Sequence, residues 1–152
     1  MRDLRGRATP SAPSLVSFLS PMTDSVVLGF DFGARRIGVA IGNSVTREAR
    51  PLTTVNATKV AARWDAVAAL LGEWEPAQLV VGIPRHPDGT PHEMTARCER
   101  FARQLEGRFS RPVARVDERY TSAVSARADD VDAAAAALIL QQWFDEECER
   151  NA

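Results

Sequence analysis

The alternation of hydrophobic and polar positions predicts an α/β domain that opens with a hairpin. Residues 26–42 contain two β-rich runs joined by a Gly-Ala-Arg-Arg turn, and in the first run Val27 and Asp31 lie on the same face. Over residues 57–74 apolar side chains recur at helical spacing, and Pro76 then leads into the apolar run LVVGIP. A helix and a buried strand are therefore expected after the hairpin.

The second half of the chain repeats this order of helix and strand. After the loop PRHPDGTP, residues 92–109 show the helical pattern again, and Pro112 opens a further strand, PVARVD. A last helix is predicted over residues 132–147, where the alanine run 133–137 is small enough to pack closely against a sheet. The pattern predicts one mixed central sheet with an N-terminal antiparallel hairpin, parallel pairing in its later part and flanking helices.

Length and composition are those of a single domain. The 152 residues, 45% of them hydrophobic, suffice for one substantial core, and no apolar run reaches the roughly 20 residues that cross a bilayer. Residues 1–22 are rich in Arg, Ser and Pro, so we expect a disordered extension or a start-site artefact, with the domain at 23–152. Cys98 and Cys148 lack the spacing of a zinc site or a disulfide framework, which favours a soluble cytoplasmic protein with Cys98 buried in a helix.

The overall charge does not by itself indicate a nucleic-acid partner. The formal net charge is −1 at pH 7, and of the 19 basic residues all except Lys59 are arginines. A guanidinium group can donate two parallel hydrogen bonds to one phosphate. Any contact with phosphate therefore has to come from a local patch of arginines.

Three acidic residues from separate segments are candidates for a functional site. Asp31 lies between two phenylalanines in an apolar strand, where an unpaired carboxylate is costly, although the amides of the Gly33 turn could satisfy it. Glu118 follows the last predicted strand, and its alternative explanation is a solvated turn with a local ion pair. Asp132 opens the last helix, where it could be a simple N-cap.

Together, these three carboxylates would supply the oxygen ligands that hard divalent cations prefer. Asp31, Glu118 and Asp132 are therefore predicted to bind Mg²⁺ or Mn²⁺. Two such ions about 4 Å apart activate a water and stabilise the leaving oxygen of a phosphodiester. This chemistry needs no histidine, and we interpret His86 and His92, which flank a Pro-Gly loop, as solvent-exposed.

Arginines near the predicted site are candidates for phosphate contacts. Four of them lie at the hairpin tip, in the central loop or beside the second acid: Arg35, Arg36, Arg85 and Arg119. An ordinary charged surface position is the alternative explanation for each. Three more on the helix over 92–109 are interpreted as a solvated face: Arg97, Arg100 and Arg103.

Four phrases of the sequence, taken in order, resemble the YqgF family. They fall within residues 26–144 and read GFDFGARRIGVAIG, LVVGIPRHPDGT, VDERYTS and VDAAAAALILQQWF. The resemblance implies a ribonuclease H-like fold related to the RuvC resolvases, and a metal-dependent nuclease that processes the 5′ end of pre-16S rRNA. The family's carboxylates fall on Asp31, Glu118 and Asp132.

The resemblance also implies partners. RNA is the expected substrate and the small ribosomal subunit a further partner, with the protein a monomer or a weak homodimer and no membrane involved. In the loop and after the DER motif, Asp88 and Thr121 complete the predicted substrate-binding set.

Two segments depart from the family pattern. Arg85, His86 and Pro87 stand where relatives carry a Leu-Asn-Met-like stretch, and the connection at 127–131 is short, without the usual basic loop. Three other functions therefore stay open. They are a Holliday-junction resolvase, an RNA- or ribosome-binding protein with weakened catalysis, and an actin-like ATP-binding domain, for which the chain has the length of only one of two lobes.

Overall fold

The structure is a computed structural model that describes residues 25–119 and 131–150. The predicted extension at 1–22 and the predicted substrate contact Thr121 lie outside these residues, and the side chain of Arg119 is not described either. In chain order the elements are β1 (Val26–Phe32), β2 (Arg36–Asn43), β3 (Ala49–Asn56), α2 (Val60–Trp74), β4 (Gln78–Arg85), α3 (Thr95–Phe109), β5 (Val113–Arg119) and α4 (Val131–Arg150).

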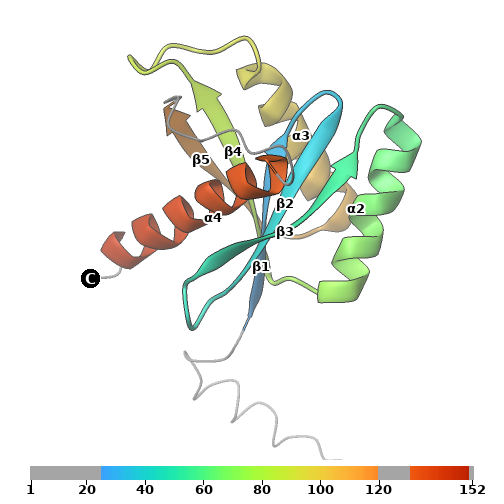
Figure 1. Cartoon of the computed structure of the whole chain (residues 1–152), viewed down its shortest axis with the longest axis horizontal. Helices are drawn as coiled ribbons and strands as arrows, with labels where there is room; N and C mark the ends of the chain where they lie inside the picture. Colours follow the sequence, from blue (N-terminus) through green and yellow to red (C-terminus); the bar gives the residue numbers. More distant parts are fainter. Residues whose placement is uncertain (1–24, 120–130, 151–152) are drawn as a thin grey trace, which may run out of the picture.

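The strands form one mixed sheet in the order β3-β2-β1-β4-β5 (Figure 1). β1, β2 and β3 pair antiparallel, whereas β4 and β5 join β1 through parallel pairing. In the β1–β2 hairpin Asp31 is the partner of Gly38. The predicted hairpin and mixed sheet are therefore confirmed.

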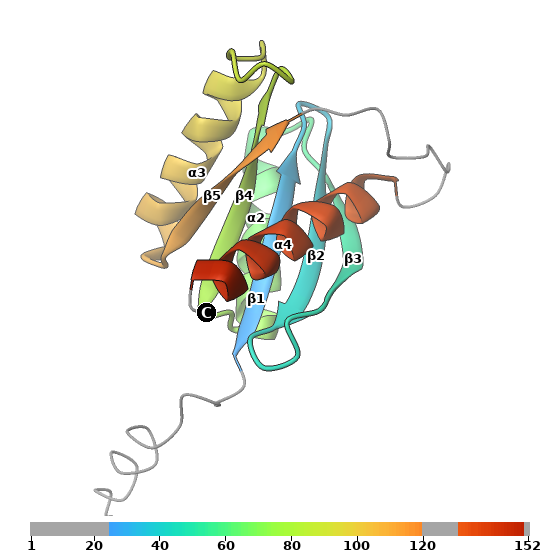
Figure 2. The ribbon, with the colours of Figure 1, turned by 90° about the vertical axis from the view of Figure 1, so that its left-hand side faces the viewer.

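Helices cover both faces of this sheet. α2 and α3 lie on one face, and α4 crosses the other (Figure 2). Residues that alternate along the strands divide between the two sides: Leu28 and Phe30 pack into the larger core under α2 and α3, and Val27 packs with α4. Cys98 is buried in the larger core, as predicted.

Two features of the fold differ from the sequence prediction. β3 was not predicted, because this edge strand is mostly half-exposed and carries Pro51 and polar threonines in place of an apolar alternation. Both central helices begin three residues later than their apolar patterns. The residues before α2 are tied to the hairpin by a bond from the N–H of Ala57 to the carbonyl of Arg35, and those before α3 form a turn in which Thr95 donates to His92.

Glycines in the strands allow α4 to lie unusually close to the sheet. An added Cβ at Gly38 would collide with the backbone carbonyl of Asp132, and one at Gly82 would collide with Ile139. At Gly29 the added atom would lie 2.9 Å from the Cβ of Leu140. The position of the first turn of α4 therefore depends on strand residues that have no side chain.

This close packing predicts that Gly38→Ala destabilises the protein. The new methyl group has to push α4 away from the sheet, which should lower the free energy of unfolding by about 2 kcal/mol and the melting temperature by about 5 °C. Thermal denaturation followed by circular dichroism measures the change.

Gly72→Ala is the matched control, because no atom lies within 4 Å of the added Cβ and the residue is inside α2. Its better helix propensity should stabilise the protein by up to about 1 kcal/mol. A Gly38→Ala protein that melts at or above the wild-type temperature would contradict the packing described above.

Candidate active site

The three predicted carboxylates come from three different elements on the α4 side of the sheet. Asp31 lies near the end of β1, Glu118 is the penultimate residue of β5, and Asp132 lies in the first turn of α4. Alternation along the strands puts Asp31 on the same face as Val27, and Glu118 on the same face as Val116, and both valines pack against α4. The fold therefore directs all three toward one region.

Glu118 extends over the strand that separates it from Asp31. β4 lies between β1 and β5, and Gly82 of β4 has no side chain on this face of the sheet. An added Cβ at Gly82 would lie 3.3 Å from Oε1 of Glu118. Glu118 is thus part of β5 and not of a solvated turn, and its carboxylate occupies space that any larger residue at position 82 would fill.

Asp132 reaches the site through its backbone contact with β2. Its carbonyl lies against Gly38, the strand partner of Asp31. Its Oδ2 accepts a hydrogen bond of 2.7 Å from Nε of Arg36, in an ion pair whose side chains are 30% and 64% exposed respectively. Because α4 begins at Val131, Asp132 is a first-turn residue whose carboxylate is held by the hairpin.

Both of the other carboxylates act on Asp31 electrostatically. Burial, then Glu118 and then Asp132 raise the pKa of Asp31 to about 7. Burial also raises the pKa of Glu118. Within the described residues no N–H or O–H group donates to the Asp31 carboxylate, so the Gly33 turn does not satisfy it there. Asp31 is thus a strand carboxylate with anionic neighbours and, among the residues that the structure describes, no ion-pair partner.

The chemistry of this donor set fits a hard divalent cation. All three residues offer carboxylate oxygens, and a cation would relieve both the burial of Asp31 and its repulsion by Glu118 and Asp132. As the side chains stand, no group of three or more His, Cys, Asp or Glu residues in 25–119 and 131–150 has the arrangement of a metal site. In this arrangement one oxygen of Asp132 is bonded to Arg36.

The other predicted contact residues lie around the site at different positions. Arg35 is exposed at the hairpin tip, beside Arg36. Arg85 is bonded through Nε to Oδ1 of Asp117 at 3.1 Å, on the α3 side of the sheet and away from the three carboxylates. Asp88 accepts bonds from N and Oγ1 of Thr90, which lower its pKa, so its carboxylate shapes the loop after β4.

The two histidines lie together in this loop. Their ring centroids are 5.2 Å apart, and Nδ1 of His92 accepts a bond from the N–H of Met94. This bond belongs to the turn that leads into α3. His86 is exposed as predicted, whereas His92 is only half-exposed because it is part of the loop structure.

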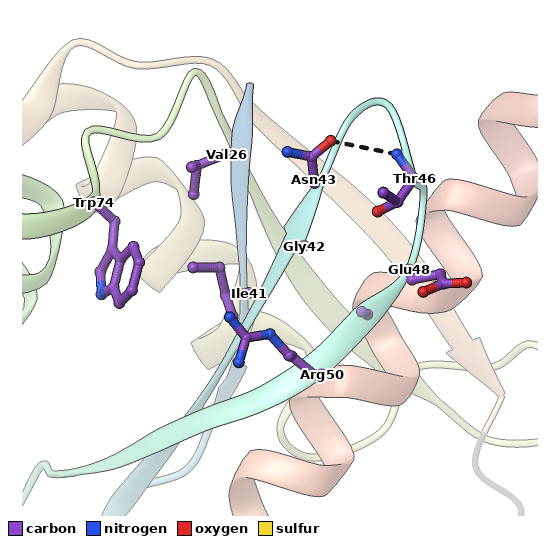
Figure 3. Close-up of a pocket in the computed structure, with 9 residues that line it drawn as sticks. Val26, Ile41, Gly42, Asn43, Thr46, Glu48, Arg50 and Trp74 are labelled. Atoms are coloured by element: carbon purple, nitrogen blue, oxygen red, sulfur yellow. Dashed lines mark hydrogen bonds between the residues drawn. The ribbon is translucent and has the colours of Figure 1, made fainter. Parts of the chain in front are cut away.

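A separate cavity of about 330 Å³ lies at the other end of the sheet (Figure 3). Its lining includes Val26, Ile41, Arg50 and Trp74. Val26 is the first residue of β1, roughly 16 Å along the strand from Asp31. The cavity is therefore distinct from the carboxylate site.

The sequence prediction did not include the glycines that shape the site. Gly38 is needed because the backbone of Asp132 occupies the space above it, and Gly82 because Ile139 does, with Oε1 of Glu118 close by. Glycine inside an apolar strand is the signal that could have identified them, since it marks a close approach of another group.

In the part of the chain that the structure describes, no helix has the length and apolar character of a membrane span.

Comparison with known proteins identifies the family. The RuvX family, described as "Holliday junction resolvase", matches residues 25–146. A relative from Paraburkholderia xenovorans is 52% identical over 130 residues, covering 80% of this chain and 89% of the relative. Another, from Polynucleobacter necessarius subsp. necessarius, is 51% identical over 135 residues, covering 86% and 90%. Both are named "Putative pre-16S rRNA nuclease".

Solved structures support the fold. The structure titled "T. thermophilus RuvC in complex with Holliday junction substrate" has a TM-score of 0.51 at 16% identity, and the match covers 82% of this chain and 96% of RuvC. The mixed five-stranded sheet with helices on both faces is thus the ribonuclease H-like fold that the sequence predicted. The chain belongs to the RuvX family, also called YqgF.

Proposed function

We propose that this protein is a metal-dependent nuclease that processes the 5′ end of pre-16S rRNA in the cytoplasm. The observation that carries the proposal is the convergence of Asp31, Glu118 and Asp132, where burial, together with the charges of Glu118 and Asp132, raises the pKa of Asp31 to about 7. Acidic groups that repel one another at the end of a strand favour a site that binds cations. Names of relatives about half identical to this chain support RNA as the substrate.

In this proposal each residue has a defined role. Asp31, Glu118 and Asp132 hold Mg²⁺ or Mn²⁺, which when bound activates water and stabilises the leaving oxygen of the phosphodiester. Arg36 positions Asp132 through their 2.7 Å bond. The exposed Arg35 contacts a phosphate beside the cut, and Arg119 and Thr121 are proposed to do the same.

The proposed partners follow from the substrate. Pre-16S rRNA is the RNA ligand, and the small ribosomal subunit is the assembly on which processing takes place. A monomer, or a weak homodimer, suffices because the three carboxylates come from one chain.

A Holliday-junction resolvase is the second candidate, because the matching family is described by that activity and RuvC shares the fold. The two substrates differ in sugar and in shape. Incubation with a four-way DNA junction and, separately, with an RNA containing the 5′ end of pre-16S rRNA distinguishes them. Cleavage of the junction alone would replace the RNA proposal with this one.

Asp31→Asn should abolish cleavage of the pre-16S substrate in Mg²⁺ or Mn²⁺, with a loss of at least about 100-fold. Asparagine keeps the size of the side chain but removes the charge that a cation needs. Asp65→Asn, at an exposed position of α2, is the matched control and should cleave at the wild-type rate.

Cleavage that survives in Asp31→Asn would show that the three-carboxylate site is not the catalytic one. RNA binding by the wild-type protein without cleavage in either metal would instead favour an RNA- or ribosome-binding protein. Gel analysis of end-labelled RNA measures both results.

The raised pKa of Asp31 also predicts how stability depends on pH without metal. Between pH 4 and 7 the unfolded chain loses the Asp31 proton while the folded protein keeps it, so stability falls as pH rises through this range. The rise of the Asp31 pKa from 3.8 to about 7 should lower the free energy of unfolding by about 4 kcal/mol above pH 7, relative to its value below pH 4.

Asp31→Asn lacks this titration, so in EDTA its advantage in melting temperature over wild type should grow from pH 4 to pH 8. Adding Mg²⁺ at pH 8 should raise the melting temperature of wild type and leave Asp31→Asn unchanged. A difference between the two proteins that is constant over this pH range would contradict the assigned electrostatics.

A further inference from the structure

We propose that the groove between α2 and α3 is a second RNA-binding site, which takes the phosphodiester backbone of the substrate on the face of the sheet opposite the carboxylates. The groove has a volume of about 170 Å³. Four arginines line it and define what we call the arginine groove: Arg63, Arg97, Arg100 and Arg108. The inference rests on the proposed RNA substrate, and it assigns to that substrate a contact far from the cut.

The positive charge of the arginine groove is not neutralised within the described residues. None of its four arginines forms an ion pair there. The two carboxylates of α3, Glu99 and Glu106, are instead engaged by Arg115 of β5. Burial lowers the pKa of the Arg63 guanidinium, and the charge of Arg97 lowers it further. The groove therefore holds like charges whose repulsion an anion would relieve.

Aromatic rings hold two of the guanidinium groups in place. Arg63 lies over the ring of Phe32 at 5.2 Å, and Arg108 lies over the ring of Trp64 at 4.4 Å. Arg63 donates from Nη2 to the carbonyl of Ala57 at 2.9 Å, but its buried Nε has no described acceptor. The Arg63 guanidinium is thus held in place at the groove, and its positive charge is suited to an oxygen-rich ligand such as phosphate.

The length of the arginine groove fits an extended anion. Arg97, Arg100 and Arg108 lie along one stripe of α3 together with Gln104. At 1.5 Å per residue this stripe is about 16 Å long, which is enough to contact several phosphates of one nucleic-acid strand. A positive stripe of this length favours an extended polyanion such as a nucleic-acid backbone.

The arginine groove and the carboxylates are close along the chain although they lie on opposite faces. Asp31 and Phe32 are consecutive in β1, so one faces the acidic site and the other forms the floor of the groove. The exposed Arg35 and Arg36 lie at the hairpin tip just beyond them. A strand bound in the groove reaches the carboxylates by crossing this tip, with positive charge along its path.

RNA binding tests the proposal without requiring cleavage. The full chain with Asp31→Asn, in EDTA, is titrated into a fluorescent RNA with the pre-16S 5′ end at several KCl concentrations. Adding Arg97→Gln and Arg100→Gln should weaken binding roughly tenfold and reduce the slope of log K against log[KCl] by about 1.5. Neither residue has a described aromatic or ionic contact, so the fold should be kept.

The control carries Arg47→Gln and Arg50→Gln, which remove the same charge from exposed positions in the β2–β3 turn and at the start of β3. Equal affinities and slopes for the two double variants would overturn the arginine groove, as would absence of RNA binding by the parent protein. Loss of binding in the groove variant, with a wild-type protein that does not cleave the RNA in Mg²⁺ or Mn²⁺, would support the groove and reject the proposed nuclease. Cleavage by the wild-type protein, with groove variants that bind like the control, would do the reverse.

Discussion

The close packing of α4 on the sheet is the constraint on which the rest of the site depends. Gly29, Gly38 and Gly82 have no side chains, so the helix backbone and its Ile and Leu side chains lie where a Cβ would otherwise be. This contact places Asp132 against the strand partner of Asp31. A helix held farther away would separate Asp132 from the two strand carboxylates, and their common electrostatic field would be lost.

The mutual repulsion of the three carboxylates destabilises the folded protein, and one ion pair partly offsets this. Asp31 is partly buried, and its ionisation is opposed by burial and by two neighbouring acids. The one described cation bonded within the group is Arg36, which pairs with Asp132 and leaves Asp31 and Glu118 without such a partner. The unfavourable burial and repulsion therefore fall on Asp31 and Glu118, which is where a divalent ion would stabilise the fold most.

Much of this arrangement could be predicted from the sequence, because hairpins and helices depend on local patterns. The apolar periods identified the hairpin, three helices and two later strands, and Asp31 stood out against its hydrophobic neighbours. β3 was missed since an edge strand needs no apolar alternation. The space above Gly38 and Gly82 could not be predicted in detail, because it depends on where a distant helix docks.

The arginine groove could not be predicted for a related reason. Arg97 and Arg100 are exposed, as the predicted solvated helix face requires, but only the packing of α2 against α3 brings Arg63 beside them. A net charge of −1 also concealed it, since the three site carboxylates lie on one face of the sheet and the four groove arginines lie on the other. This separation has a physical reason. Arg36 is already bonded to one oxygen of Asp132, and guanidinium groups paired with Asp31 and Glu118 as well would displace a cation, whereas arginines behind the sheet can attract phosphate and leave these two carboxylates free.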